Sequence, residues 1–248
     1  MPRILPGIIC AFALLNVAPA QRMDTIRVGS RALNATGFLL GTDTVDGFEL
    51  SGGKRKATNT TIRSITLEQY ANEHVYLMRA IDWTPAGDST WSSTIMRVSD
   101  FSLVHHKVKG SHDSAAVTTT SSQLTAWVVL PPKPIVLLDL VLERPVFPLG
   151  GQVPWLLTML PLAPGYQAVV PEFSEWDGRE VWKHVDVLDV EKITVHNKTY
   201  ECWKVDTGPI GPPGYHMYRW IDKASRRIIQ SVLRGGMTGT EYWSVLRL

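Results

Sequence analysis

The sequence predicts a mainly β protein built as an antiparallel meander, with one short apolar helical segment near 153–162. Short runs rich in Val, Ile, Thr, Trp and Tyr recur along the chain, separated by Gly, Asp, Asn, Ser and Pro. Short turns join successive runs, which favours sequential hairpins and antiparallel pairing. The dense apolar cluster at 153–162 breaks the strand pattern, and Pro154 suits the first turn of a helix.

The expected strands fall into two series on either side of this segment. The first series is Phe38–Leu40, Gly47–Leu50, Thr61–Gln69, Val75–Trp83, Ser93–Val98, Ser102–Lys109, Ala115–Thr120 and Leu124–Leu130. The second series is Tyr166–Pro171, Val181–Val195, Thr199–Asp206, Tyr215–Ile221, Arg227–Leu233 and Glu241–Leu246. Within 181–195 the apolar pattern changes phase, since Val187 shares a face with Val185 but Val190 does not. A one-residue slip inverts every side chain, so we expect a β-bulge or a corner there.

A turn is expected at Asp222-Lys223-Ala224-Ser225, because Asp is favoured at the first position of a type I turn. The turn joins the strand that ends at Ile221 to the strand that begins at Arg227.

The N-terminal segment 1–20 is typical of a secretory signal peptide rather than of a folded element. Arg3 precedes an apolar run from Ile8 to Val17, and Ala18-Pro19-Ala20 offers the small residues that signal peptidase requires. We expect cleavage after Ala20 and one β-rich domain over 21–248. No apolar stretch approaches the ~20 residues of a membrane-spanning helix, so no transmembrane segment is expected.

Cleavage would remove Cys10 and leave Cys202, so the mature chain has no partner for an intramolecular disulfide. The neighbours of Cys202 supply no positive charge that would lower the pKa of a thiol. We therefore expect a buried, structural cysteine.

Composition and motifs exclude several function classes. The 25 Lys and Arg against 23 Asp and Glu give a net charge of +2, which provides no electrostatic basis for nucleic-acid binding. There is no G-x-S-x-G elbow, Walker A loop, H-E-x-x-H or C-x-x-C. His105 and His106 point to opposite faces of a strand and cannot bind one metal. His184 and Asp186 share a face, but no nucleophile accompanies them. No catalytic residue, metal site or cofactor is predicted.

Tryptophan is the unusual residue of this sequence, and its large side chains either fill a curved sheet or line a concave apolar cavity. The nine are Trp83, Trp91, Trp127, Trp155, Trp176, Trp182, Trp203, Trp220 and Trp243. The cluster Trp155-Leu156-Leu157-x-Met159-Leu160 is too apolar for a free surface, so we expect it to enter the concave face as a plug or a lid. The candidate ligand-binding residues are Trp83, Trp127, Trp155, Leu156, Met159 and Trp220.

The C-terminal half resembles the periplasmic family called domain of unknown function 3108. The resemblance rests on Phe147-Pro148, on Leu160-Pro161-Leu162 with Pro164-Gly165, on 199–205, and above all on the Trp-Asp hairpin 218–229. It covers 147–248 closely and 30–146 loosely, and Lys198 stands where the family pattern has Gly. The hairpin is similar to that of carrier and receptor proteins that transport lipoproteins to the outer membrane.

The resemblance implies an unclosed antiparallel half-barrel around apolar residues, export to the periplasm and no catalytic residues. Two functions follow as hypotheses. The first is a non-catalytic protein that binds an acyl chain or a lipoprotein-like apolar ligand in a concave sheet. The second is a structural or assembly factor of the cell envelope, with a filled core and a protein partner. A filled barrel with an exposed apolar edge would favour the second. An enzyme is a less favoured alternative, and an outer-membrane β-barrel is the least favoured.

Overall fold

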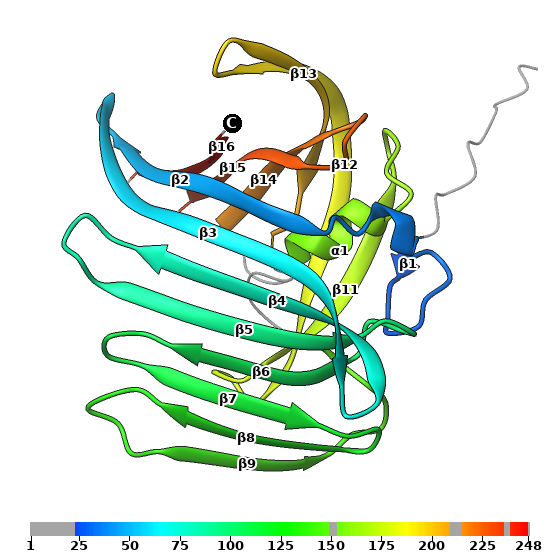
Figure 1. Ribbon diagram of the computed structural model, residues 1–248. Coiled ribbons are helices and arrows are strands. Elements are labelled where there is room, and N and C mark those ends of the chain that lie inside the picture. The colour runs from blue at the N-terminus through cyan, green and yellow to red at the C-terminus, as the bar shows by residue number, and fades with distance from the viewer. Residues whose placement is uncertain (1–22, 149–152, 209–214, 236–238, 248) are drawn as a thin grey trace, which may run out of the picture.

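The structure is a computed structural model that describes residues 23–148, 153–208, 215–235 and 239–247 (Figure 1). The signal peptide expected at 1–20 lies outside the described residues.

One sheet contains every described strand. Its first half is β1 (Asp24–Thr25), β2 (Gly41–Ser51), β3 (Lys54–Tyr70), β4 (Glu73–Trp83), β5 (Ser89–Arg97), β6 (Leu103–Lys109), β7 (Ser114–Thr119), β8 (Gln123–Val129) and β9 (Val136–Val141). Its second half is β10 (Phe147–Pro148), β11 (Gln167–Ser174), β12 (Arg179–Val195), β13 (Lys198–Asp206), β14 (Tyr215–Asp222), β15 (Ile228–Gly235) and β16 (Glu241–Arg247). The two helical elements are the 3-10 turn η1 (Ala35–Gly37) and α1 (Val153–Met159).

Two antiparallel meanders make up the sheet, as the sequence predicts. Strands β2 to β9 pair in chain order, β11 to β16 do the same, and β16 pairs with β2 to join the meanders. The path ends at β9 on one side and at β11 with β1 on the other. These ends do not pair with each other, so the prediction of an unclosed half-barrel is confirmed.

Several strands are longer than predicted, the short strands β1 and β10 were not predicted, and two further differences stand out. The expected strand at Phe38–Leu40 is instead a bend after η1, where Phe38 packs its ring 4.3 Å from that of Tyr76. Strand β9 was not predicted, because its apolar residues follow a Pro-rich connector. The expected bulge in β12 is confirmed as a shift of register between Val187 and Asp189.

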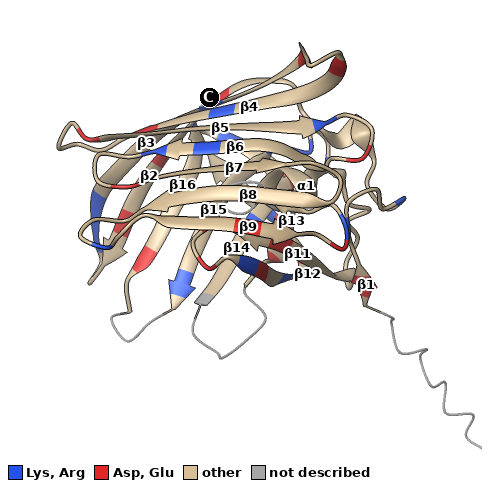
Figure 2. Ribbon diagram, turned by 90° about the horizontal axis from the view of Figure 1, so that it is seen from below, with Lys and Arg blue, Asp and Glu red and all other residues tan. Residues whose placement is uncertain are grey.

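A short bridge connects the two halves of the curved sheet beside β11. The Leu103 amide donates to the Val146 carbonyl at 3.1 Å, and the neighbouring Phe147 pairs in parallel with Glu172 of β11. Strands β7, β8 and β9 continue beyond this bridge, and we call them the flap (Figure 1 and Figure 2). The inner face of the flap packs on β11 through Phe173 and Val146. We call β2–β6 with β11–β16 the barrel.

Helix α1 fills the barrel interior between strands of both meanders (Figure 1). Leu156 and Leu157 are buried among side chains that include Tyr76, Met96 and Trp203. Turn η1 seals one side of the helix, since a Cβ at Gly37 would lie 2.2 Å from a backbone oxygen of α1. Neither helical element in the described part of the chain has the length and hydropathy to cross a membrane.

Candidate functional site

The predicted residues on the helical segment lie together in the barrel interior. Leu156 and Met159 are buried in the main core, with 2% and 1% of their surface exposed. Trp155 is half-buried and borders a small cavity of about 40 Å³ that Ile65 and Arg63 also line. Only Trp155 of these three therefore lies beside open space.

The three predicted sheet tryptophans do not face the helix. Trp83 lies on the opposite face of β4 from Tyr76 and Met78, with 40% of its surface exposed. Trp127 lies on the exposed face of β8. Trp220 is buried in a second cluster on the other side of the sheet, where it donates to Glu191 at 2.7 Å. The helix meets Tyr76, Trp203 and aliphatic residues instead, because each strand's alternation decides which aromatics point inward.

A second cavity, of about 130 Å³, lies next to the start of α1 inside the barrel. A row of small residues makes room for it, because Ser231 of β15 pairs with Ser244 of β16 and both line the cavity. Arg219 of β14 continues this row, since it pairs with Ser231. The cavity is lined by Val45, Arg63, Pro154, Met217, Arg219, Ile228, Ile229, Gln230, Ser231, Ser244 and Leu246.

The two arginines of this cavity differ in their partners. Arg63 makes a two-pronged ion pair with Asp43, with nitrogen–oxygen distances of 2.8 and 2.9 Å. Arg219 donates to the neutral hydroxyl of Thr207 and forms no ion pair with a described carboxylate. Glu172 and Asp206 act on its charge from a greater distance and favour the charged guanidinium. Burial lowers the pKa of Arg219 to about 10, so the guanidinium stays charged at neutral pH. The cavity therefore combines apolar walls with one cation that lacks a carboxylate contact.

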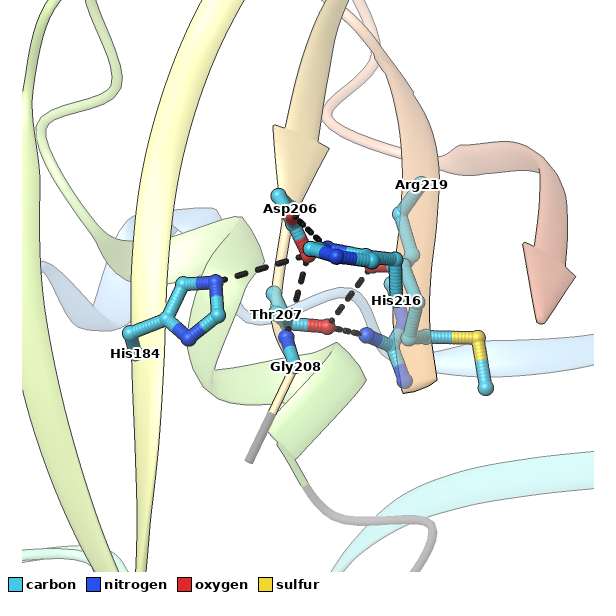
Figure 3. Close-up of polar contacts among 7 residues, drawn as sticks. His184, Asp206, Thr207, Gly208, His216 and Arg219 are labelled. Carbon is cyan, nitrogen blue, oxygen red and sulfur yellow. Dashed lines mark hydrogen bonds and ion pairs between the residues drawn. The ribbon is translucent and has the colours of Figure 1, made fainter. Parts of the chain in front are cut away.

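The end of β13 holds Arg219 in place (Figure 3). Thr207 accepts the bond from Arg219 and donates to the carbonyl of Met217 at 3.2 Å. Its neighbour Asp206 lies on the other face of the strand and contacts His216 at 2.7 Å and His184 at 3.4 Å. His184 thus contacts Asp206 rather than Asp186, which shared its face in the sequence pattern.

Glu172 is a buried carboxyl that the sequence analysis did not single out. It is 1% exposed, and neither of its side-chain oxygens has a hydrogen-bond partner. Burial raises its pKa, while the charges of Lys183 and Arg219 act in the opposite direction. An unpaired buried carboxylate is costly, so the fold favours the neutral acid.

Two further titratable residues meet where the flap joins the barrel. His106 of β6 and Glu175, just after β11, are both buried, with 3.6 Å between Nε2 and Oε1. Burial lowers the pKa of His106 to about 4 and raises that of Glu175 to about 7. The contact is therefore not an ion pair at neutral pH. His105 points to the opposite face, as predicted, and the described residues contain no group able to hold a metal.

Cys202 is fully buried, as expected, and burial raises the pKa of its thiol to about 12. Its environment therefore disfavours the reactive thiolate.

Sequence reasoning missed Arg219 although the strand pattern carries a signal. Met217, Arg219 and Ile221 alternate on one face of β14, so a single charge interrupts an apolar series. Such a charge at an inward position marks a candidate binding residue. The pair of Ser231 and Ser244 gives no such signal, because it depends on the register between two strands.

Comparisons with known proteins support the fold and leave the family open. No protein-family model matches the chain, and no curated protein matches its sequence. Among solved structures, a β-barrel-like protein of domain of unknown function 1849 from Brucella abortus matches with a TM-score of 0.52 and 10% identity. The match covers 87% of this chain and 98% of that one. At this identity the likeness supports a β-barrel-like fold alone, and the expected membership of domain of unknown function 3108 is not shown.

Proposed function

We propose that the mature chain, 21–248, is exported to the periplasm and acts without catalysis as a binder of an amphiphilic carboxylic acid, such as an acyl chain. The observation that carries the proposal is the cavity beside α1, where Arg219 makes no direct ion pair with a described carboxylate and where Val45, Met217 and Leu246 supply apolar walls. A ligand carboxylate would give the guanidinium the charge-assisted, two-pronged hydrogen bonds that it lacks.

The present cavity fits the head and the first few carbons of such a ligand. An apolar cavity of about 150 Å³ holds one benzene ring, and this cavity measures about 130 Å³. A longer tail therefore needs space that α1 now occupies. Pro154 lines this cavity and Trp155 lines the smaller one, so a shift of the first turn of α1 would affect both. In this proposal α1 is a lid whose first turn moves when the tail enters.

The direct test uses dansylaminoundecanoic acid and its uncharged methyl ester with the purified mature protein. Arg219→Met keeps an apolar stem and removes the charge, so it should weaken binding of the acid about tenfold or more and leave the ester unchanged. Arg79→Met, an exposed arginine on β4, is the matched control and should change neither affinity. Equal affinities of the acid for the native protein and for Arg219→Met would refute the proposed site.

Trp155→Ala separates a lid from a permanent plug. A lid predicts a modest loss of stability together with changed acid binding, because mobile elements belong to the less stable parts of a structure. A plug predicts no binding by the native protein and a loss of about 3–5 kcal/mol in the variant.

The second candidate is the envelope assembly factor with a protein partner. Two observations favour it: α1 fills most of the barrel, and apolar side chains of and beside strand β9 are exposed. Leu137 and Val141 have 77% and 89% of their surface exposed.

A further inference from the structure

The two ends of the sheet are finished differently. At one end, the outer edge of β11 is covered by two short parallel strands, β1 and β10. At the other end, β9 pairs with β8 alone among the strands that the structure describes. Natural proteins usually blunt such an edge with a bulge, a proline or a lysine. Strand β9 contains no proline and no lysine, and its six residues pair with β8 without a bulge.

The register identifies the backbone groups that point away from the sheet. The Leu142 amide donates to the Ser122 carbonyl directly opposite. In an antiparallel pair, hydrogen-bonded positions alternate with positions whose N–H and C=O groups point outward. Residues Leu137, Asp139 and Val141 therefore present their backbone donors and acceptors at the open edge.

The side chains of the same three residues share one face of the flap. This is the outer face, because Leu138 and Leu140 point the other way and pack on the flap core. Leu137 pairs with Trp127, which is 36% exposed. Asp139, the one charge of the strand, accepts a bond from the Gln123 side chain at 2.7 Å. Along the outer face of β9, Leu137, Asp139 and Val141 therefore form the pattern apolar-acidic-apolar.

We propose that an extended segment of a different protein adds to the sheet as an antiparallel strand beside β9. The outward backbone N–H and C=O groups of Leu137, Asp139 and Val141 can form hydrogen bonds with those of another strand. This mode of peptide binding is called β-augmentation. Residues directly opposite share a face, so the best partner has the pattern apolar-x-basic-x-apolar, with its basic residue across from Asp139. This inference rests on the second candidate function and does not involve the interior cavity.

A second copy of this chain fits the edge less well. Antiparallel self-pairing that uses all three outward residues places Asp139 directly across from Asp139 of the other copy. Two like charges in that position repel each other. The registers that avoid this clash pair Asp139 with Leu137 or Val141 and use fewer of the three outward residues.

The test uses a fluorescein-labelled peptide, Thr-Val-Thr-Lys-Thr-Val-Thr, and fluorescence anisotropy with the mature protein. Replacing the central Lys by Glu should weaken binding about tenfold. Asp139→Lys should reverse this preference, and Val141→Lys should weaken both peptides. Equal affinity for the two peptides, with no reversal in Asp139→Lys, would overturn the proposed pairing.

Backbone methylation provides the matched control for strand addition. N-methylation of the central Lys blocks an amide that faces β9 and should abolish measurable binding. N-methylation of a Thr blocks an amide that faces away and should change the affinity less than about twofold. Similar effects at the two positions would overturn strand addition.

Sedimentation velocity tests the alternative occupant. A dimer of the native chain that dissociates in Val141→Lys would show that a second copy occupies the edge and would overturn the proposal. Arg219→Met should keep the peptide affinity, so failure of the fatty-acid test and failure of the peptide test are distinguishable.

Discussion

The barrel interior and the flap are built from the same kind of hairpins, yet they bury their apolar residues in different ways. The interior cluster has twenty buried residues, drawn from both meanders, from η1's flanks and from α1. The flap cluster has six, which come chiefly from neighbouring strands and the bridge. Strands of the barrel have packing partners that are distant in sequence, whereas β9 leaves its edge and outer face exposed. The comparison predicts that the flap opens more easily than the barrel.

The largest effect should come from truncating the centre of the interior cluster. Leu157 has no exposed surface and lies within α1, so Leu157→Ala should lower the free energy of unfolding by about 2–5 kcal/mol. Leu124→Ala in the flap, which is equally buried, should cost less because the small cluster can relax around the cavity. Urea denaturation measures both values.

Hydrogen exchange sharpens the same comparison. Leu124→Ala should accelerate exchange of β7 and β8 amides selectively, whereas Leu157→Ala should accelerate exchange throughout the barrel. Equal acceleration of both regions by each variant would show that flap and barrel unfold as one unit.

The contact between His106 and Glu175, where the flap joins the barrel, should make the free energy of unfolding depend on pH. Glu175, with its pKa raised to about 7 from 4.5, stabilises the fold below pH 4.5 and loses that contribution as pH rises to about 7. His106, with its pKa lowered to about 4 from 6.5, contributes above pH 6.5 and loses that contribution as pH falls to about 4. The two slopes therefore oppose each other between pH 4.5 and 6.5. The pKa of Glu172 is also raised, so Glu172 changes the free energy of unfolding with pH in the same direction as Glu175.

His106→Gln should expose the glutamate contribution. Without His106, the free energy of unfolding should fall more steeply with rising pH between pH 4.5 and 6.5, by about 1 kcal/mol per pH unit relative to the native protein. Denaturant titrations across this range measure the slope. His112→Gln, which changes an exposed histidine in the turn between β6 and β7, is the control and should leave the slope near that of the native protein. Parallel curves for His106→Gln and the native chain would contradict the assignment.

Local pattern predicted the hairpins, the bulge in β12, the helical segment and the buried Cys202. These features depend on residues close in sequence, such as the phase change between Val187 and Val190. The pairing of β16 with β2 and the parallel pairings of β11 could not be predicted, because register between distant strands leaves no local signal. Strand β9 was missed because Pro131–Pro134 directly precedes it and favoured an irregular connector.

The candidate site was predicted less well than the fold. The apolar cluster of α1 correctly indicated a segment inside the concave sheet, and Trp155 does border a cavity. Trp83 and Trp127 were chosen for their size, but alternation places them on exposed faces. Glu172 became visible only when the fold placed β11 beside the interior, whereas Arg219 interrupts an apolar series on β14 that the sequence already contains.

A smaller effect should come from the turn beside the barrel core. The Asp222 carboxylate accepts bonds from the Ser225 amide at 2.9 Å and from its hydroxyl at 2.6 Å. The same turn carries Arg226, whose guanidinium donates to the Leu160 carbonyl directly after α1. Asp222→Ala should cost about 1 kcal/mol, as the loss of comparable local caps does. Thermal unfolding measures this, and unchanged stability would show that the turn forms without its side-chain bonds.

The smallest effect should come from the open edge, which makes it the most direct test of the contrast between the two regions. Val141 is 89% exposed on the outer face of β9, so Val141→Lys should change the free energy of unfolding by less than about 0.5 kcal/mol. Its neighbour Leu140 points inward and packs on the flap core, so Leu140→Lys should cost several times more because it buries a charge or opens the cluster. Denaturation of the two variants in parallel measures the difference between the faces. If both changes lower the free energy of unfolding equally, the outer face of β9 is not free. In that case the edge proposed for a partner strand is already covered.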